Sequence, residues 1–268
     1  FGGGFSQINE VEAFLNSGNI SGVAIGAALH SNDLSVEDLT KISASEGMKL
    51  KKTINNDQSL DNNYLKGIEV VVVDYGMGNQ LSLINALESI GAYVSLTDVP
   101  EKIYSAKVVI LPGVGSFPCG MEELEKRNLK ETLIRRFKEN KPIIGICLGM
   151  QLFFKRSSEF SITEGLGFFD SEVIHLKDHL ENTDKSTSEY QEAEMRLPHV
   201  GWNGLVEPFG RSKFLSENLL LDKKFYFVHN YGVKSCTNLD FYIHTAYEKI
   251  KPLALCEKKN AVGFQFHP

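Results

Sequence analysis

The strongest constraint on the fold is an alternation of apolar runs and helical segments that begins after Gly67. Residues 68–74, 106–113 and 141–147 contain continuous stretches of Val, Ile and Leu, which are typical of strands buried on both faces of a sheet. Residues 80–91 and 121–140 lie between these runs and have apolar positions at helical spacing. Strands that alternate with helices predict a parallel sheet covered by helices on both faces.

The pattern changes after Gly167, where the apolar segments become shorter and more strand-like. These segments lie at residues 168–176, 224–233, 241–247, 252–259 and 261–267. They favour mixed or antiparallel strands that extend the sheet. The predicted fold class is therefore α/β, with an open sheet whose central strands are parallel.

The chain is expected to contain two unequal pieces, because 268 residues exceed the usual size of one domain. Residues 1–42 have the pattern of glycine loop, helix, strand and helix, which indicates an α/β fragment. Residues 43–66 are polar and rich in Asn, Lys and Ser, which is typical of a linker. Residues 67–268 form the second and larger unit.

The composition is that of a soluble globular protein and excludes several classes of function. With 28 Lys and Arg against 34 Asp and Glu, the net charge of −6 offers no basic surface for nucleic acid or an anionic membrane. The apolar runs are shorter than the roughly 18 residues that span a bilayer, and no leader opens the chain, so we expect a cytoplasmic protein. Cys119, Cys147, Cys236 and Cys256 form no CxxC pair, so neither a disulfide framework nor a metal or cofactor site is indicated.

Cys147 stands between an apolar strand and a helix-forming run, with Gly145 and Gly149 two residues away on either side. Small neighbours permit the sharp strand-to-helix turn that lifts a nucleophile above a sheet. A helix N-terminus at this point lowers the pKa of a thiol, and the amide of Leu148 can point at a developing oxyanion. The alternative is that Cys147 is a small core residue, since free cysteine is among the most buried residue types.

His267 is the candidate general base for this thiol. It ends the strand-like run 261–267, and residues distant in sequence can meet at neighbouring strand ends. His30 and His175 close other apolar runs, and the neighbours of His244 are apolar and aromatic, which is more typical of structural histidines.

A second loop, PGVG at residues 112–115, follows another predicted strand. Its glycines allow the backbone to approach a ligand closely. Taken by itself, the same pattern is also that of an ordinary strand-to-helix turn.

Six motifs occur in one order along the larger unit: DYGMGN, LPGVGSF, GICLGMQ, PHVGWN, YFVHNY and GFQFHP, starting at residues 74, 111, 145, 198, 226 and 263. Together they resemble the class I glutamine amidotransferases and, within them, the glutaminase subunit of imidazole glycerol phosphate synthase. The PGVG loop, with DYGMGN and GWN, argues against the carbamoyl phosphate, GMP and anthranilate branches. The resemblance covers residues 67–268 and implies a flavodoxin-like open sheet.

The resemblance also implies a role for individual residues. Cys147 would attack the side-chain amide of glutamine and His267 would transfer the proton, so that a glutamyl thioester releases ammonia before water frees glutamate. The implied oxyanion groups are the amides of Leu148 and Val114, with Gly113 allowing the loop to rotate. The implied glutamine-binding residues are Gly115, Gln151, His229, Asn230 and Tyr231. Asn79 and Trp202 would face a (β/α)8 synthase or cyclase partner.

One part of the family pattern is missing. The family completes its triad with a Glu two residues after the histidine, whereas this sequence ends at Pro268. Since the group that orients the imidazole contributes orders of magnitude in the analogous serine proteases, these 268 residues are expected to be a poor catalyst and a truncated fragment of a longer protein.

Residues 1–42 resemble the C-terminal part of the phosphate-binding (β/α)8 barrels of histidine biosynthesis, of the cyclase type. The matching phosphate-binding positions would be Gly3, Gly4, Gly26 and Ala27, although Ala27 replaces the serine usual in the cyclase. An unrelated α/β segment is the alternative. Because the other strands of such a barrel are absent, this piece is not expected to carry out cyclisation.

Three alternatives to histidine biosynthesis remain open. A variant synthase pair would supply ammonia to the amidation of a surface sugar. A non-catalytic domain would dock on a barrel and regulate it. Related elbow-cysteine proteases and chaperones also place a nucleophile at a strand-to-helix turn, but they give no reason for the PGVG, GWN and FQFHP motifs.

Overall fold

The computed structural model describes residues 67–180, 195–215 and 220–267. The described residues all belong to one compact unit, Asp61–Pro268. The predicted barrel fragment at residues 1–42, the linker at 43–66 and the phosphate-binding positions lie outside the described residues.

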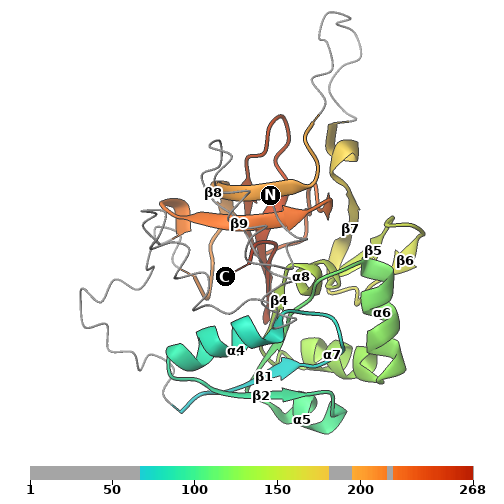
Figure 1. Ribbon diagram of the computed structural model, residues 1–268, viewed down its shortest axis with the longest axis vertical. Coiled ribbons are helices and arrows are strands. Elements are labelled where there is room, and N and C mark those ends of the chain that lie inside the picture. Colours follow the sequence, from blue (N-terminus) through green and yellow to red (C-terminus); the bar gives the residue numbers. More distant parts are fainter. Residues whose placement is uncertain (1–66, 181–194, 216–219, 268) are drawn as a thin grey trace, which may run out of the picture. The chain divides into compact units, whose positions relative to one another are not determined.

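The main sheet has nine strands in the order β2-β1-β3-β4-β13-β12-β11-β8-β9 (Figure 1). Its first five strands pair in parallel, as predicted for the centre of the sheet. They are β2 (Tyr93–Thr97), β1 (Glu69–Val73), β3 (Val108–Leu111), β4 (Ile143–Ile146) and β13 (Ala261–Phe264). β13, from the C-terminal end of the chain, thus lies directly beside β4, which leads into Cys147.

The other half of the main sheet is antiparallel. It consists of β12 (Leu253–Lys258), β11 (Phe241–Thr245), β8 (His199–Gly210) and β9 (Lys224–His229). A smaller sheet contains β10 (Tyr231–Gly232), β7 (Phe169–His175), β5 (Phe154–Ser157) and β6 (Thr163–Glu164), and the 3-10 helix η1 (Leu176–Leu180) follows β7. The prediction that antiparallel strands extend the sheet is confirmed for β11, β12 and β9, whereas β7 and β10 belong to the smaller sheet.

Helices cover both faces of the parallel strands. They are α4 (Gln80–Ser89), α5 (Pro100–Ser105), α6 (Phe117–Lys126), α7 (Leu129–Lys138) and α8 (Leu148–Gln151). Figure 1 shows α4 on one side of β1 and β2 and α5 on the other. Because successive side chains of a strand point to opposite faces, Val70 and Val72 pack with Leu83 of α4, whereas Val71 and Val73 join the cluster formed by α5, α6 and α7.

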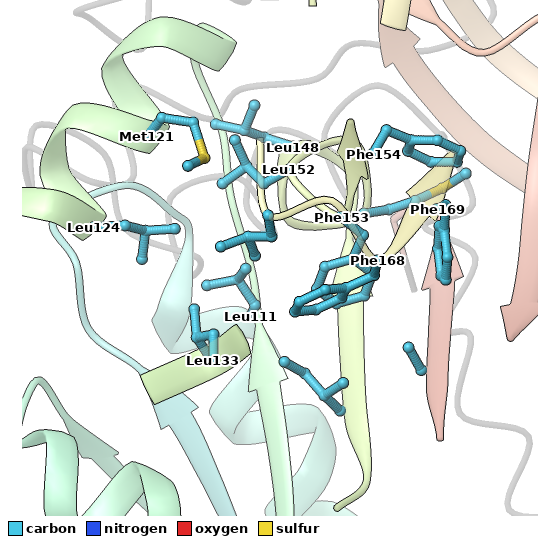
Figure 2. Close-up of a cluster of buried hydrophobic side chains, with 14 of the residues drawn as sticks. Leu111, Met121, Leu124, Leu133, Leu148, Leu152, Phe153, Phe154, Phe168 and Phe169 are labelled. Atoms are coloured by element: carbon cyan, nitrogen blue, oxygen red, sulfur yellow. The ribbon is translucent and has the colours of Figure 1, made fainter. Parts of the chain in front are cut away.

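The larger core cluster lies on the α5–α7 side of the sheet (Figure 2). Leucines of β3, α6, α7 and α8 gather there with four phenylalanines, Phe153, Phe154, Phe168 and Phe169. The ring centroids of Phe153 and Phe168 are 4.9 Å apart. This cluster supports the chain directly after Cys147 with rigid aromatic side chains.

Several elements differ from the prediction or were not predicted. The single helical segment 121–140 is two helices, since Asn128 between them has a left-handed φ of 56°. The helix expected after Cys147 has only four residues, because the chain turns into β5 at Phe154. β2, α5, β5, β6, η1 and β8 were not predicted. Within residues 67–180, 195–215 and 220–267, no helix is long and apolar enough to cross a membrane.

Candidate active site

Cys147 occupies a strained turn between β4 and α8. Its φ of 54° and ψ of −111° place a non-glycine residue in an unfavourable region, where strain persists only if the surroundings hold it. The Cys147 amide donates to the carbonyl of Phe264 in the neighbouring strand at 2.7 Å. The predicted nucleophile elbow is therefore confirmed as a backbone geometry.

The two glycines around Cys147 are required by packing. A Cβ on Gly145 would lie 2.7 Å from the carbonyl oxygen of Gly149, and a Cβ on Gly149 would overlap the Leu111 carbonyl and lie 2.8 Å from its carbon. Distances below 3.0 Å are essentially never found for real Cβ atoms. The absence of side chains at both positions thus lets α8 pack directly on β3 and β4.

The protonation state of Cys147 differs from the prediction. Burial raises the pKa of the thiol to about 11, against the weaker effects of the Leu148 amide and the Gln265 side chain, which lower it. The prediction that a helix N-terminus lowers this pKa was wrong in its net direction. The reason is that α8 is a single turn, so the loss of solvation of the buried sulfur outweighs the effect of the helix N-terminus.

The PGVG loop lies directly over the elbow. The carbonyl of Gly113 accepts a hydrogen bond from the Leu148 amide at 3.3 Å, and the carbonyl of Pro112 accepts one from the buried hydroxyl of Tyr75 at 2.7 Å. Gly113 has no room for a Cβ, which would meet the Tyr75 hydroxyl and lie 2.9 Å from Leu148 Cβ. One of the two predicted oxyanion donors, the Leu148 amide, is thus occupied by the loop. No sequence argument had singled out Tyr75.

A cavity of about 460 Å³ opens beside the elbow. Both predicted catalytic side chains, Cys147 and His267, line it, although they are 120 residues apart in sequence. So do all the predicted glutamine-binding residues: Gly115, Gln151, His229, Asn230 and Tyr231. Val114, Leu148, Glu159, Pro198 and Val228 complete the lining. This volume is in the range of small-molecule sites.

A second cavity of about 300 Å³ adjoins the first, since Val114 and His267 line both. Gly113 and Asn79 line this second cavity and not the first. The Asn79 side chain also caps α4 by accepting from the Ser82 amide at 3.5 Å.

Glu159 is the cavity residue that sequence reasoning missed. Its carboxylate accepts a hydrogen bond from the amide of Phe117, the first residue of α6, at 2.7 Å. Burial is the largest influence on its pKa and raises it, whereas this hydrogen bond lowers it. Glu159 lies in none of the six motifs, so no local pattern could have identified it.

Hydrogen bonds connect the cavity wall into one network. The carbonyl of Tyr231 accepts from Gln151 Nε2 at 2.9 Å and lies 2.8 Å from His229 Nδ1, which therefore carries the proton. His229 Nε2 lies 3.0 Å from His199 Nδ1. Burial lowers the pKa of His229 to about 3, so the ring is neutral at physiological pH and its Nδ1–H acts as donor.

His267 is held by the sheet and is also neutral at physiological pH. Its amide donates to the carbonyl of Tyr226 at 3.0 Å, across an isolated antiparallel bridge. Burial lowers the pKa of the His267 imidazole, which leaves a ring nitrogen free to accept a proton.

Trp202 lies on the outer face of β8 and lines neither cavity. Its side chain is 67% exposed and lies beside Tyr226 of the paired strand, with ring centroids 5.6 Å apart. Val200 and its register partner Val228 are also exposed. With the half-buried Tyr226, these three exposed side chains form an apolar face, which we call the β8–β9 face.

The described part of the chain offers no metal site: no group of three or more His, Cys, Asp and Glu side chains is placed to hold a metal ion. The predicted phosphate-binding positions Gly3, Gly4, Gly26 and Ala27 lie outside the described residues. The site is thus built from a thiol, two neutral imidazoles, a carboxylate and amides.

Comparisons with known proteins agree with this arrangement. Residues 71–268 match the family described as glutamine amidotransferase class-I. Imidazole glycerol phosphate synthase subunit HisH 2 of Vibrio vulnificus is 38% identical over 207 residues, which cover 75% of this chain and 87% of the relative. Subunit HisH of Carboxydothermus hydrogenoformans is 40% identical over 198 residues, covering 74% of this chain and 90% of the relative.

Two solved structures share the fold. A glutamine amidotransferase crystal structure has a TM-score of 0.50 at 15% identity, covering 74% of this chain and 89% of that one. PurLQS from Thermotoga maritima has a TM-score of 0.51 at 16% identity, covering 75% and 87%. On the family match and the identity to the HisH subunits, this chain belongs to the class I glutamine amidotransferases, in the group of the imidazole glycerol phosphate synthase subunit HisH.

Proposed function

We propose that this protein hydrolyses glutamine to glutamate and ammonia through a thioester on Cys147, and that the ammonia is used by a cyclase partner to form imidazole glycerol phosphate in histidine biosynthesis. The observation that carries the proposal is the cavity that a strained cysteine and a neutral histidine both line. Its volume suits one amino acid, and its polar side chains suit a zwitterion with a carboxamide.

The first half of the reaction transfers the glutamyl group to sulfur. Cys147 Sγ attacks the side-chain carbonyl carbon of glutamine while His267 takes the thiol proton, and the carbonyl becomes an oxyanion. His267 then returns the proton to the nitrogen as the C–N bond breaks, so that ammonia leaves and the thioester remains.

The second half releases glutamate. Water attacks the thioester as His267 accepts one of its protons, and the C–S bond breaks when the proton passes back to Cys147. The carboxylate of Glu159 is suited to hold the α-ammonium group of glutamine throughout, since it is the acidic group of the cavity lining.

The resting geometry suggests that the loop controls the rate. With the thiol pKa raised by burial, attack depends on an oxyanion site that stabilises the developing charge. The Gly113 carbonyl accepts the hydrogen bond of the Leu148 amide. The Gly113–Val114 peptide therefore has to rotate before the amides of Leu148 and Val114 can both face the oxyanion. We therefore propose that basal activity is low and that partner docking favours the rotated loop.

The β8–β9 face is the proposed docking surface for the cyclase, and Asn79 beside the second cavity is proposed as a further contact. Exposed aromatic and aliphatic side chains in one cluster are typical of protein interfaces. The relatives are named as subunits of imidazole glycerol phosphate synthase, which supports a partner of that kind.

The test is glutamate release from glutamine, measured with and without a cyclase subunit of imidazole glycerol phosphate synthase and its nucleotide substrate. We expect the partner to stimulate hydrolysis and Cys147→Ser to lower it by about 10³-fold or more. Cys119→Ser is the matched control, since Cys119 is exposed and lines neither cavity.

Hydrolysis that survives Cys147→Ser would contradict the mechanism. Ammonia transfer to a sugar acceptor but not to the cyclase would favour the surface-sugar alternative. Stimulation of the cyclase without any hydrolysis would favour the regulatory domain.

A further inference from the structure

Gln265 is a buried side chain that contacts the nucleophile and that the mechanism above does not use. It directly follows β13, where its amide donates to the Ala254 carbonyl at 2.9 Å, and it is 1% exposed. Its Nε2 lies 3.8 Å from Cys147 Sγ, within hydrogen-bonding distance for sulfur, and its Oε1 lies 2.9 Å from Gln151 Nε2.

The orientation of both amides follows from one backbone carbonyl. The Tyr231 oxygen can only accept, so Gln151 must turn its NH2 group toward it. The second N–H of Gln151 then points at Gln265, which must present its oxygen there. This leaves the NH2 group of Gln265 facing Cys147, and a flip of either amide would set two donors or two acceptors against each other.

We propose that Gln265 is a further catalytic residue, whose side-chain N–H stabilises the Cys147 thiolate and whose orientation is set by Gln151 and the Tyr231 carbonyl. This inference rests on the proposed function for its use in catalysis, but the hydrogen bond itself does not depend on the identity of the substrate.

The effect is expected to be large because few groups can stabilise a charge on this sulfur. Burial raises the pKa of Cys147, and the two influences that lower it are the Leu148 amide and the Gln265 side chain. The other titratable side chains around the thiol are His267, His229, Tyr231 and Glu159 in the cavity and Tyr75 behind the loop, none of which is cationic at physiological pH. Removing one hydrogen bond to a charged sulfur should raise the pKa by about one unit, which is tenfold in thiolate fraction.

The variants are designed to separate the direct contact from general packing. Gln265→Met keeps a similar volume and removes the N–H donor. Gln265→Asn keeps the amide but is one methylene too short to reach the sulfur. It tests the contact with Cys147 if the methionine variant does not fold. Gln151→Met removes the side chain that orients Gln265 but leaves the Gln265 N–H within reach of Cys147, so it should have a smaller effect than the Gln265 variants.

The measurement is the ultraviolet absorbance of the thiolate in the full chain, taken as the difference from the same protein carrying Cys147→Ser, with circular dichroism to establish folding. The measurement is made at about pH 10, below the midpoint of the Cys147 titration. We expect the thiolate fraction to fall about tenfold in Gln265→Met and Gln265→Asn, and by less than about threefold in Gln151→Met. Alkylation of Cys147 should slow by only about threefold, since a more basic thiolate is a better nucleophile.

An unchanged thiolate fraction in the folded Gln265 variants would overturn the inference, and an unchanged fraction in Gln151→Met would overturn the orienting role of Gln151. The outcome is independent of glutamine turnover. A shift in thiolate fraction together with no glutamine hydrolysis in the presence of the cyclase partner would uphold the hydrogen bond and refute the proposed function. Hydrolysis stimulated by the partner without any shift would uphold the function and refute the role of Gln265.

Discussion

Replacement of Gly149 by Ala tests how the elbow is built. Gly149 lies in the turn α8, and an added Cβ would overlap the carbonyl oxygen of Leu111 in β3 and lie 2.8 Å from its carbon and 3.3 Å from the carbonyl carbon of Pro112. Carbon atoms in contact are normally about 3.5–4.0 Å apart. The turn and the strand would therefore have to separate by roughly 1 Å.

The cost follows from the rigidity of both partners. Overpacking a core costs about 1–3 kcal/mol, and the upper end applies because the obstacle is strand backbone, which has no rotamer to change. We expect a loss of about 3 kcal/mol in the free energy of unfolding. The same movement would displace Cys147 relative to Gly113 by up to 1 Å or so, and a misplacement of about that size costs roughly 10²-fold in rate.

The assays are urea unfolding followed by circular dichroism and glutamate release with the cyclase partner. Gly120→Ala is the matched control: it lies in α6, is also buried, and its Cβ would meet only methyl groups of Leu148 and Leu152 at 3.2–3.3 Å. Those side chains can shift, and Ala favours a helix by about 1 kcal/mol over Gly, so little change is expected. The reasoning is refuted if Gly149→Ala unfolds at the same urea concentration as Gly120→Ala and hydrolyses glutamine equally fast.

Three further predictions concern a buried cation, a buried imidazole and a carboxylate. Arg136→Met should lower the free energy of unfolding by about 3 kcal/mol or more, because the fully buried guanidinium donates to four backbone carbonyls that would lose their donor. Unfolding in urea measures this loss, and a loss below about 1 kcal/mol would argue against the reasoning. The pKa of His229 is about 3 in the folded protein against 6.5 in the unfolded chain, so its neutral form contributes stability that is complete above pH 6.5 and is lost as the pH falls toward 3. In His229→Gln, stability measured across this window should fall less steeply, by up to about 1.4 kcal/mol per pH unit, and an unchanged slope would contradict the burial of a neutral ring. Glu159→Gln should raise the KM for glutamine about tenfold with a smaller change in kcat, since one charge-assisted hydrogen bond to the ammonium group is lost, and steady-state kinetics with an unaltered KM would remove Glu159 from the binding site.

The strands and the elbow could be predicted because their signals are local. A strand buried on both faces needs a continuous apolar run, as in β1, β3 and β4, and a tight turn needs small residues beside Cys147. β2 was missed because its side chains are mostly exposed or half-buried and alternate with polar residues. α8 was predicted too long because helix propensity does not report that Phe153 and Phe154 are drawn into the core instead.

The candidate site shows the same division. Cys147, His267 and the five predicted glutamine-binding residues were identified from motifs, and the structure places them around one cavity. Glu159 lies outside all six motifs, and Gln265 lies within GFQFHP but has a role that depends on a contact made only in the folded chain. Glu159 accepts from Phe117, and Gln265 reaches Cys147 across 118 positions.

The sequence by itself determined the buried parallel strands β1, β3 and β4, the place of the nucleophile and the type of chemistry, because these depend on residue types and their spacing along the chain. Only the tertiary structure decided the charge state of Cys147, the occupation of the Leu148 amide by Gly113 and the arrangement of Gln151 with Gln265. A pKa depends on desolvation and on neighbouring dipoles, and both arise only when β4, β13 and the loop after β3 are packed together.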